Sequence, residues 1–594
     1  MTFVHPPASP ARLRDHSADG RMLLLALAAV PVGAGGAAGA WALLGLIALA
    51  TNLFWHARLA TLPAAMMAPL PLLVALPVLG SVIVGLMARF GSEKIRGHGI
   101  PEAIEAILYG ESRLSLKVAI LKPLSSAISI GSGGPFGAEG PIIMTGGAIG
   151  SLFAQGFHLS AAERKTLLVA GAAAGMTAIF GTPLAAVLLA VEVLLFEWKP
   201  RSFVPVVIAV LVASALRPGW IGAGPMFPAA LGVPAGAWPL AAALGLGALA
   251  GLLAGLLSAL LYRIEDGFHR LPVHWMWWPA LGGLAVGLGA LVEPRVLGAG
   301  YGNIQALLDG GMTARATALL LVMKAAVWLV ALGSGTSGGV LAPLLMLGGA
   351  LGALVGLLLP GGAGVWAMLG MAGIMSGAMR APLTGALFAA ELTGHLEALP
   401  LTLAAAAGAH AVSVLLMRRS ILTEKIARRG RHILQEYTVD PLDLIQAGAI
   451  MTPDPQTLPG TMPMAEAAAF LAGPAGHRSY PVVDAAGRLL GLVSRGDALA
   501  LGPGGAEPGA TLADRLSDAS QPCATPETPA AAIADLILES GIGRIPVVAP
   551  GSGQVIGIVT RHDLLKVRHR VRAEEHRPPR PGRSSHRAAH LAAH

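Results

Sequence analysis

The sequence predicts an all-α polytopic membrane protein followed by a smaller α/β domain in the cytoplasm. Of its 594 residues, 54% are hydrophobic and only 12% are charged, whereas an ordinary soluble domain has about 25% charged residues. Long apolar runs recur along the chain, and each is long enough to cross a hydrocarbon layer of about 30 Å. These runs include 22–50, 60–87, 238–261 and 398–417.

Composition divides the chain into four parts. We expect an N-terminal tail at 1–20, a membrane domain at 21–430, an α/β region at 447–569 and a disordered basic tail at 570–594. Arginines flank the first apolar run and follow the last one. Because Lys and Arg gather at the cytoplasmic ends of membrane spans, both termini are predicted to be cytoplasmic, in a chain of the cell (inner) membrane. Because membrane orientation already explains these basic residues, no nucleic-acid partner is expected.

The membrane domain contains an internal repeat. Residues 131–152 align without gaps with residues 333–354, and 11 of the 22 positions are identical. Lys122 pairs with Lys324 at the same offset. Two related halves are therefore predicted, at about 60–217 and 240–418. Matching Gly/Pro interruptions in duplicated apolar segments are typical of transporters whose helices break near the middle of the membrane.

Three of these breaks have the composition of an anion site. A helix that begins inside a membrane leaves its first N–H groups without partners, and several such ends together attract an anion, aided by the helix dipoles. A cation path would need rings of acidic residues, and acidic residues are scarce here. An anion site made of backbone amides requires no metal or cofactor. The candidate anion-binding residues are Gly97, His98, Gly99, Ile100 and Pro101; Gly137, Ala138, Gly140 and Pro141; and Gly339, Val340, Leu341, Ala342 and Pro343.

Glu139 is the one acidic residue within these three stretches. Its carboxylate is itself an anion, so it can compete with a permeating anion for the same backbone amides and act as a gate. The alternative is a glutamate that only stabilises the start of a helix. The residues alone leave both interpretations open.

The stretches GHGIP (97–101), GAEGP (137–141) and GGVLAP (338–343) resemble the anion-site motifs of the CLC chloride channel and transporter family, whose usual forms are GSGIP, G(K/R)EGP and GxFxP. The resemblance covers nearly the whole apolar region, with the motifs in the family's order. It implies an inverted repeat with broken helices, chloride as the bound ion and a homodimer with one pore in each subunit. It also implies that Glu139 is the gating glutamate.

Among the positions that depart from the family pattern, four bear on the mechanism. His98 replaces a serine that contacts the anion, and it either donates an imidazole N–H or only caps a helix. Leu341 replaces the phenylalanine of the third motif, and Leu422 stands at the position of the coordinating tyrosine. Val193 occupies the position of the inner proton glutamate of proton-coupled members, directly after Glu192. Because valine cannot relay a proton, we predict channel-type conduction, with chloride/proton antiport as the alternative.

The α/β region contains two similar blocks, at 447–500 and 515–569, that resemble a tandem CBS pair. Each is predicted to form strand, turn, strand and then a helix start. The spacing of Ser494 to Asp497 and of Thr560 to Asp563 suits helix capping, and the resemblance also implies possible adenine-nucleotide binding at these residues. CBS pairs also occur on magnesium transporters, which is a more remote alternative. The sequence offers no nucleophile–base set, and an enzyme is not expected.

Overall fold

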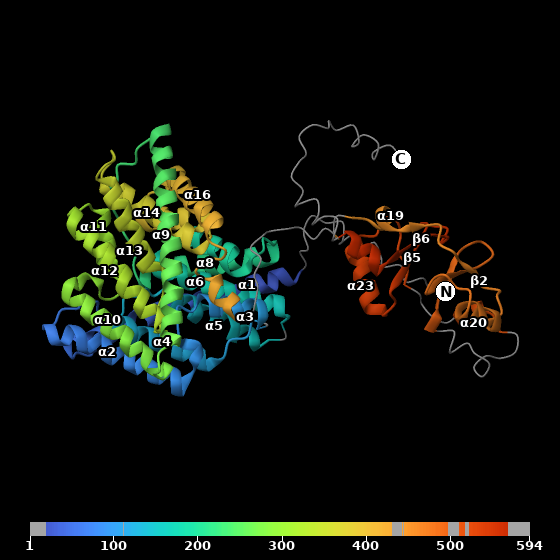
Figure 1. The fold of residues 1–594 in the computed structure, drawn as a ribbon, viewed down its shortest axis with the longest axis horizontal. Coiled ribbons are helices and arrows are strands. Elements are labelled where there is room, and N and C mark those ends of the chain that lie inside the picture. Colours follow the sequence, from blue (N-terminus) through green and yellow to red (C-terminus); the bar gives the residue numbers. More distant parts are fainter. Residues whose placement is uncertain are drawn as a thin grey trace. The chain divides into compact units, whose positions relative to one another are not determined.

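The computed structural model describes residues 20–110, 112–157, 159–429, 442, 445–496, 510–516 and 522–567. The chain forms two compact units, one of residues 16–437 and one of residues 1–15 with 438–594. Figure 1 shows a helical unit and a smaller unit of mixed helices and strands. The tails predicted at 1–20 and 570–594, apart from Gly20, lie outside the described residues.

Within its described residues, the larger unit contains seven helical segments that are long and apolar enough to cross a membrane. Their main helices are α1 (Arg21–His56), α2 (Leu70–Leu86), α8 (Pro200–Trp220), α9 (Ala237–His269), α10 (Trp278–Val292), α12 (Ala314–Gly333) and α16 (Leu399–Leu416). The apolar run expected from residue 60 becomes helical only at Leu70. Proline restricts the residue before it to extended conformations. Pro63 and Pro69 lie before the helix, and Pro71 lies in its first turn.

The remaining helices, most of them shorter, pack among these segments, and several of them begin inside the membrane domain, as predicted. They are α3 (Ile100–Tyr109), α4 (Leu116–Gly131), α5 (Glu139–Gln155), α6 (Ala161–Phe180), α7 (Pro183–Leu189), α11 (Tyr301–Leu308), α13 (Leu341–Gly356), α14 (Ala363–Met379), α15 (Pro382–Thr393) and α17 (Thr423–Arg428).

Glycines bring equivalent helix pairs together in the two halves. A Cβ on Gly146 of α5 would lie 2.2 Å from the carbonyl oxygen of Gly171 in α6. In the second half, a Cβ on Gly348 of α13 would lie 2.4 Å from the carbonyl oxygen of Gly370 in α14. Small residues allow helix backbones to approach closely in a membrane. The sequence repeat therefore corresponds to a repeat of packing.

The loops of the two halves also bond to each other, with amides of the second half donating to carbonyls of the first. The Gly338 amide of the second half donates to the Gly97 carbonyl of the first at 3.4 Å. The Gly298 amide of the second half donates to the Gly133 carbonyl of the first at 3.0 Å. Each half thus contributes a loop that the other half holds, and this fixes the helix starts next to these loops.

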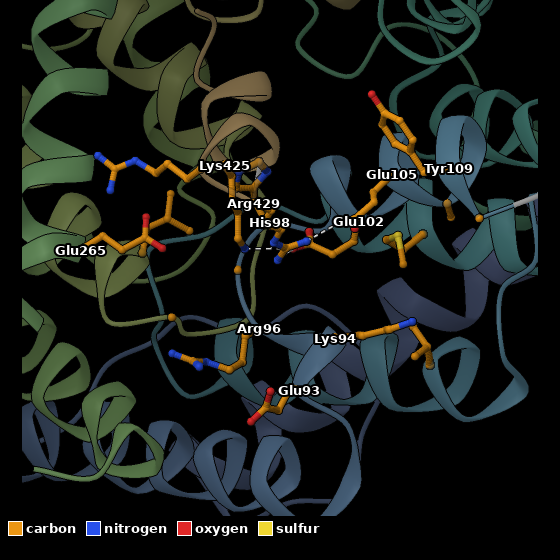
Figure 2. A pocket seen from close by; sticks show the side chains of 18 of the residues that line it. Glu93, Lys94, Arg96, His98, Glu102, Glu105, Tyr109, Glu265, Lys425 and Arg429 are labelled. Carbon is orange, nitrogen blue, oxygen red and sulfur yellow. Dashed lines mark hydrogen bonds and ion pairs between the residues drawn. The ribbon is translucent and has the colours of Figure 1, made fainter. Parts of the chain in front are cut away.

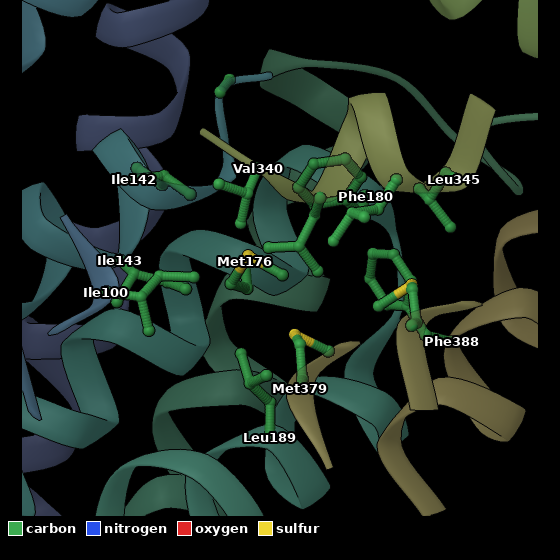
Figure 3. Close-up of a cluster of buried hydrophobic side chains, with 14 of the residues drawn as sticks. Ile100, Ile142, Ile143, Met176, Phe180, Leu189, Val340, Leu345, Met379 and Phe388 are labelled. Atoms are coloured by element: carbon green, nitrogen blue, oxygen red, sulfur yellow. The ribbon is translucent and has the colours of Figure 1, made fainter. Parts of the chain in front are cut away.

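An apolar cluster packs around these helix starts (Figure 3). The rings of Phe180, at the end of α6, and Phe388, in α15, lie 5.4 Å apart. Val340 and Leu345, at the start of α13, are fully buried in the same core. Close packing of this kind helps to hold the polar backbone ends in place.

The smaller unit matches the predicted pair of blocks. Its elements are α19 (Ala447–Ile450), β1 (Thr452–Pro453), β2 (Leu458–Pro459), α20 (Met464–Ala472), β3 (Ser479–Val483), β4 (Leu489–Ser494), α22 (Leu512–Leu516), α23 (Ala530–Ser540), β5 (Arg544–Val548) and β6 (Val555–Thr560). The sheets have the orders β2-β3-β4 and β1-β6-β5, so a strand of the first block completes the sheet of the second. The Leu489 amide donates to Gly553 and the Val555 amide to Gly487, which joins the two hairpins.

Candidate anion site

Three helix starts meet at the centre of the membrane unit. Isolated bridges pair Gly97 with Ser337 and Gly137 with Gly339, directly before helices α3, α13 and α5. In the last bridge, the Gly137 amide donates to Gly339 at 3.2 Å and the Gly339 amide donates back at 2.9 Å. The stretches that the sequence singled out at 97–101, 137–141 and 338–343 are thus brought together at one place.

The helix starts leave amide groups free to face an anion. The first internal hydrogen bonds are donated by Ala103 in α3, Ile142 in α5 and Leu344 in α13. The amides before these residues point out of the helix ends, and proline at the second or third position removes one donor that the helix would not have used. With the positive ends of three helix dipoles alongside, the backbone here can hold an anion.

Glu139 occupies this meeting point. Its side chain is fully buried, and its two carboxylate oxygens form no hydrogen bond of full geometry. The polar groups that act on the carboxylate are the amides of Glu139 and Ala342 and the hydroxyl of Tyr301. The carboxyl group therefore lies against the same amides that would bind an anion, without a hydrogen bond of full geometry to any of them.

Two glycines are required by this geometry. A Cβ on Gly140 would lie 1.8 Å from the carbonyl oxygen of His98, which is inside the van der Waals distance. A Cβ on Gly339 would lie 2.7 Å from the carboxylate oxygen Oε2 of Glu139. These two positions must therefore lack a side chain, so that the loops can approach one another and the carboxylate can lie between them.

A buried lysine supports the loop at 95–98, which we call the inner loop. Lys122, on α4, is 0% exposed, and its Nζ donates to the carbonyls of Ile95 at 2.8 Å and Gly97 at 2.6 Å and to Oγ of Ser337 at 3.1 Å. Its positive charge lies behind the loop that carries His98, where it favours an anion. The repeat had already paired Lys122 with Lys324, but only the fold shows what the pair holds.

A charged cavity of about 1320 Å³ borders the site at Gly97 and His98. Figure 2 shows His98 beside the cluster of Glu102, Lys425 and Arg429. Nζ of Lys425 lies 2.9 Å from Glu102, and Arg429 pairs with both Glu102 and Glu105. Among the described residues, seven basic and five acidic side chains line the cavity, so its charge favours the entry of anions.

The substituted positions differ in their surroundings. His98 lines the cavity and is 3% exposed, and its Nδ1 has no partner among the described residues. Leu341 begins α13 and is fully buried. Leu422 is buried at the start of α17, where Tyr262 donates its hydroxyl to the carbonyl of the neighbouring Ile421 at 2.6 Å. The Tyr262 hydroxyl thus bonds to the backbone beside the start of α17.

The two membrane-embedded acids near Val193 cap helices of the opposite half. Glu192 accepts from the amides of Leu383 at 3.3 Å and Thr384 at 2.8 Å, at the start of α15. Glu391 accepts from the amides of Leu184 and Ala185, at the start of α7. Val193 is 2% exposed.

Tyr301 is a site residue that the sequence reasoning missed. Its hydroxyl lies 3.4 Å from the amide of Ala138, 163 positions away in the chain, and faces Glu139. A signal was present, because GAGYG at 298–302 follows the pattern of GHGIP at 97–101.

In the smaller unit, Asp563 caps the helix that follows β6. It accepts from the amide of Thr560 at 2.9 Å and from the hydroxyl at 2.7 Å. Ser494 lies at the equivalent end of β4, and Asp497 lies outside the described residues. Both ends border a cavity of about 520 Å³, whose charged lining among the described residues is basic: Arg478, Arg495, Arg544, Arg561 and His562.

Comparisons with known proteins agree with this architecture. The profile of the voltage gated chloride channel family matches residues 79–414, and that of the CBS domain matches residues 447–503 and 518–570. The voltage-gated ClC-type chloride channel ClcB of Escherichia coli O81 is 33% identical over 366 residues, which cover 60% of this chain and 87% of that protein.

Two solved structures share the fold. A slow cyanobacterial Cl−/H+ antiporter has a TM-score of 0.61 at 23% identity and covers 70% of this chain and 99% of its own. A eukaryotic CLC transporter has a TM-score of 0.58 at 22% identity and covers 92% of this chain and 99% of its own. The chain is therefore a multi-pass membrane protein with a CBS pair, and it belongs to the voltage-gated chloride channel (CLC) family of ion channels and transporters.

Proposed function

We propose that this chain conducts chloride or a related anion across the membrane as a passive channel, with Glu139 as the gate, and catalyses no chemical reaction. The observation that carries the proposal is the buried, unbonded carboxylate of Glu139 at the meeting point of α3, α5 and α13. The match of the membrane unit to the chloride channel family and the amides at the site argue against the magnesium-transporter alternative.

Gating follows from competition for the amides. An ionised Glu139 lies where an anion would bind and blocks the path. When the carboxyl group is protonated, it loses its attraction to the helix dipoles and leaves the amides to the anion. Acidic conditions should therefore increase anion flux. The cavity at His98, with its excess of basic side chains, supplies anions from the inner side.

Passive conduction is favoured over antiport by the surroundings of the inner-glutamate position. Val193 cannot carry a proton, and the adjacent Glu192 accepts three hydrogen bonds, two from amides and one from the Thr384 hydroxyl at 2.6 Å. A carboxylate held in this way is a helix cap. Its counterpart Glu391 has the same arrangement, which supports a structural role for both.

The test is a flux measurement in liposomes that contain the full-length protein. Chloride efflux and proton movement are recorded together at several pH values for the wild type, Glu139→Gln and the control Glu539→Gln, which changes an exposed acid of the CBS pair. We expect chloride efflux that rises on acidification with no proportional proton movement, and loss of the pH dependence in Glu139→Gln alone. Stoichiometric proton movement in the wild type would assign the chain to the antiporters.

We further propose that the protein is a homodimer of the inner membrane, with a pore in each subunit and both termini in the cytoplasm. The arginine-flanked ends of the membrane unit support this orientation. Chemical cross-linking in native membranes and protease access to the two tails would test assembly and orientation separately.

For the CBS pair, we propose binding of an adenine nucleotide through its phosphates. The cavity bordered by Thr560 and lined by four arginines favours a phosphate chain, while the carboxylate of Asp563 is engaged with Thr560. Calorimetric titration of the full-length protein should show binding of ATP and much weaker binding of adenosine. Arg561→Ala should weaken ATP binding, and equal affinity for ATP and adenosine would contradict the proposal.

A further inference from the structure

The second half contains a counterpart of the inner anion loop. Residues 298–302 (GAGYG) correspond to residues 97–101 (GHGIP) at an offset of 201. Gly99 and Gly300 both have a positive φ, of 88° and 74°, and each directly precedes a helix, α3 or α11. The buried lysines match as well, since Lys122 donates to the Gly97 carbonyl and Lys324 to the Gly298 carbonyl. The fold therefore presents a fourth helix start, that of α11.

This fourth helix start reaches Glu139 through Tyr301, the first residue of α11. The Tyr301 hydroxyl lies 3.4 Å from the Ala138 amide, which donates to it. The ring packs against Phe227, with the two ring centres 6.0 Å apart. Both contacts fix the position of the hydroxyl next to the carboxylate. Since a phenol has one proton to donate, and the Ala138 contact does not use it, that proton is available to the carboxylate.

We propose that Tyr301 is the positioning residue of the gate: its hydroxyl, held by the Ala138 amide, donates to the Glu139 carboxylate and stabilises the blocking position. The inference rests on the proposed gating function. It explains why the fully buried Glu139 carboxylate, which forms no hydrogen bond of full geometry, lies beside a hydroxyl that the neighbouring Ala138 amide holds in place. The second half thus contributes the donor and the first half contributes the acid.

The surroundings of Glu139 contain few other groups that could take this role. Among the described residues, Tyr301 is the titratable side chain that acts on the carboxylate, and the other contributions come from backbone amides. Lys122 donates to the inner loop and Ser337, and His98 lines the inner cavity. The Tyr301 hydroxyl is therefore separate from the charged groups of the cavity at His98.

The test is a double-mutant cycle on chloride efflux from liposomes across a range of pH. Tyr301→Phe removes the hydroxyl and keeps the ring that packs on Phe227. Loss of a hydrogen bond to an ionised group should move the midpoint of the flux profile toward higher pH by about one unit, a tenfold change in proton concentration. In the Glu139→Gln background, the same substitution should leave the flux unchanged, because the charged acceptor is absent.

The control is Tyr480→Phe, which removes a buried hydroxyl that accepts from the His477 amide in the CBS pair; its profile should match the wild type. An unchanged profile in Tyr301→Phe contradicts the inference alone. An equal shift in the Glu139→Gln background would also contradict it, since that result indicates a general structural effect. Wild-type vesicles that release no chloride would contradict the proposed function together with the inference.

Discussion

The two halves of the membrane unit have nearly the same backbone at the anion site and different side chains. Position 139 in the first half corresponds to position 341 in the second, and one is glutamate while the other is leucine. Both residues begin a helix, α5 or α13. The comparison teaches that the amide groups for an anion are a repeated property of the backbone, whereas the gate is a property of one side chain in one half.

The same asymmetry holds around the site. The inner loop of the first half carries His98 and opens to the charged cavity, whereas the matching loop of the second half carries Ala299 and then Tyr301. Two halves with related backbones can therefore place different side chains on the two sides of an anion path. The first three predictions below compare equivalent positions in the two halves, and the last concerns His98 alone.

The largest effect is expected where the halves differ in tolerance of a Cβ. Gly140 corresponds to Ala342, but a Cβ at 140 would lie 1.8 Å from the His98 carbonyl oxygen. Gly140→Ala should destabilise the protein by about 3 kcal/mol and abolish chloride flux. Thermal unfolding in detergent and liposome efflux measure the two effects. Ala342→Gly should cost only about 1 kcal/mol, and Gly45→Ala, where a Cβ meets nothing within 4 Å, serves as the control.

The two buried lysines separate stability from anion binding. Lys122→Met and Lys324→Met each remove the lysine donor from two backbone carbonyls and should each cost about 1–3 kcal/mol. Only Lys122 supports the inner loop beside the three helix starts. Chloride affinity, measured by calorimetry, should therefore fall about tenfold in Lys122→Met and much less in Lys324→Met. Equal losses of affinity would show that the halves contribute alike to the field at the site.

The reciprocal helix caps give a matched test of proton coupling. Glu192→Gln and Glu391→Gln each weaken hydrogen bonds to two amides at a helix start and should each lower stability by about 1 kcal/mol. Chloride flux and proton movement should otherwise remain as in the wild type. If Glu192→Gln removes proton movement and Glu391→Gln does not, the first half contains a relay that its capping geometry does not suggest.

The smallest effect is expected at His98. His98→Ser restores the usual family residue, and a serine hydroxyl can replace an imidazole N–H as a donor. Chloride flux should change by less than about threefold, because the amides and Lys122 remain and a single neutral hydrogen bond contributes about 1 kcal/mol. His98→Ala, which removes the donor, should reduce flux further. If all three proteins conduct equally, His98 contributes only to packing.

Much of the architecture could be predicted from local sequence. Apolar runs gave the spans, Gly and Pro marked the helix starts at Ile100, Glu139 and Leu341, and the duplicated segments indicated two halves. In the CBS pair, the alternating strands and the Thr560–Asp563 cap were also readable. These features depend on neighbouring residues: a proline or glycine determines where a helix can begin whatever lies elsewhere in the chain.

The partners of individual polar groups could not be predicted. Glu192 caps a helix 191 positions away, and Tyr301 reaches Ala138 across 163 positions. The sequence by itself determined that backbone amides and one carboxylate would lie at the helix breaks inside the membrane. Only the tertiary structure decided which groups meet, because contacts between the halves depend on how glycine-lined helices pack, and no local pattern records that packing.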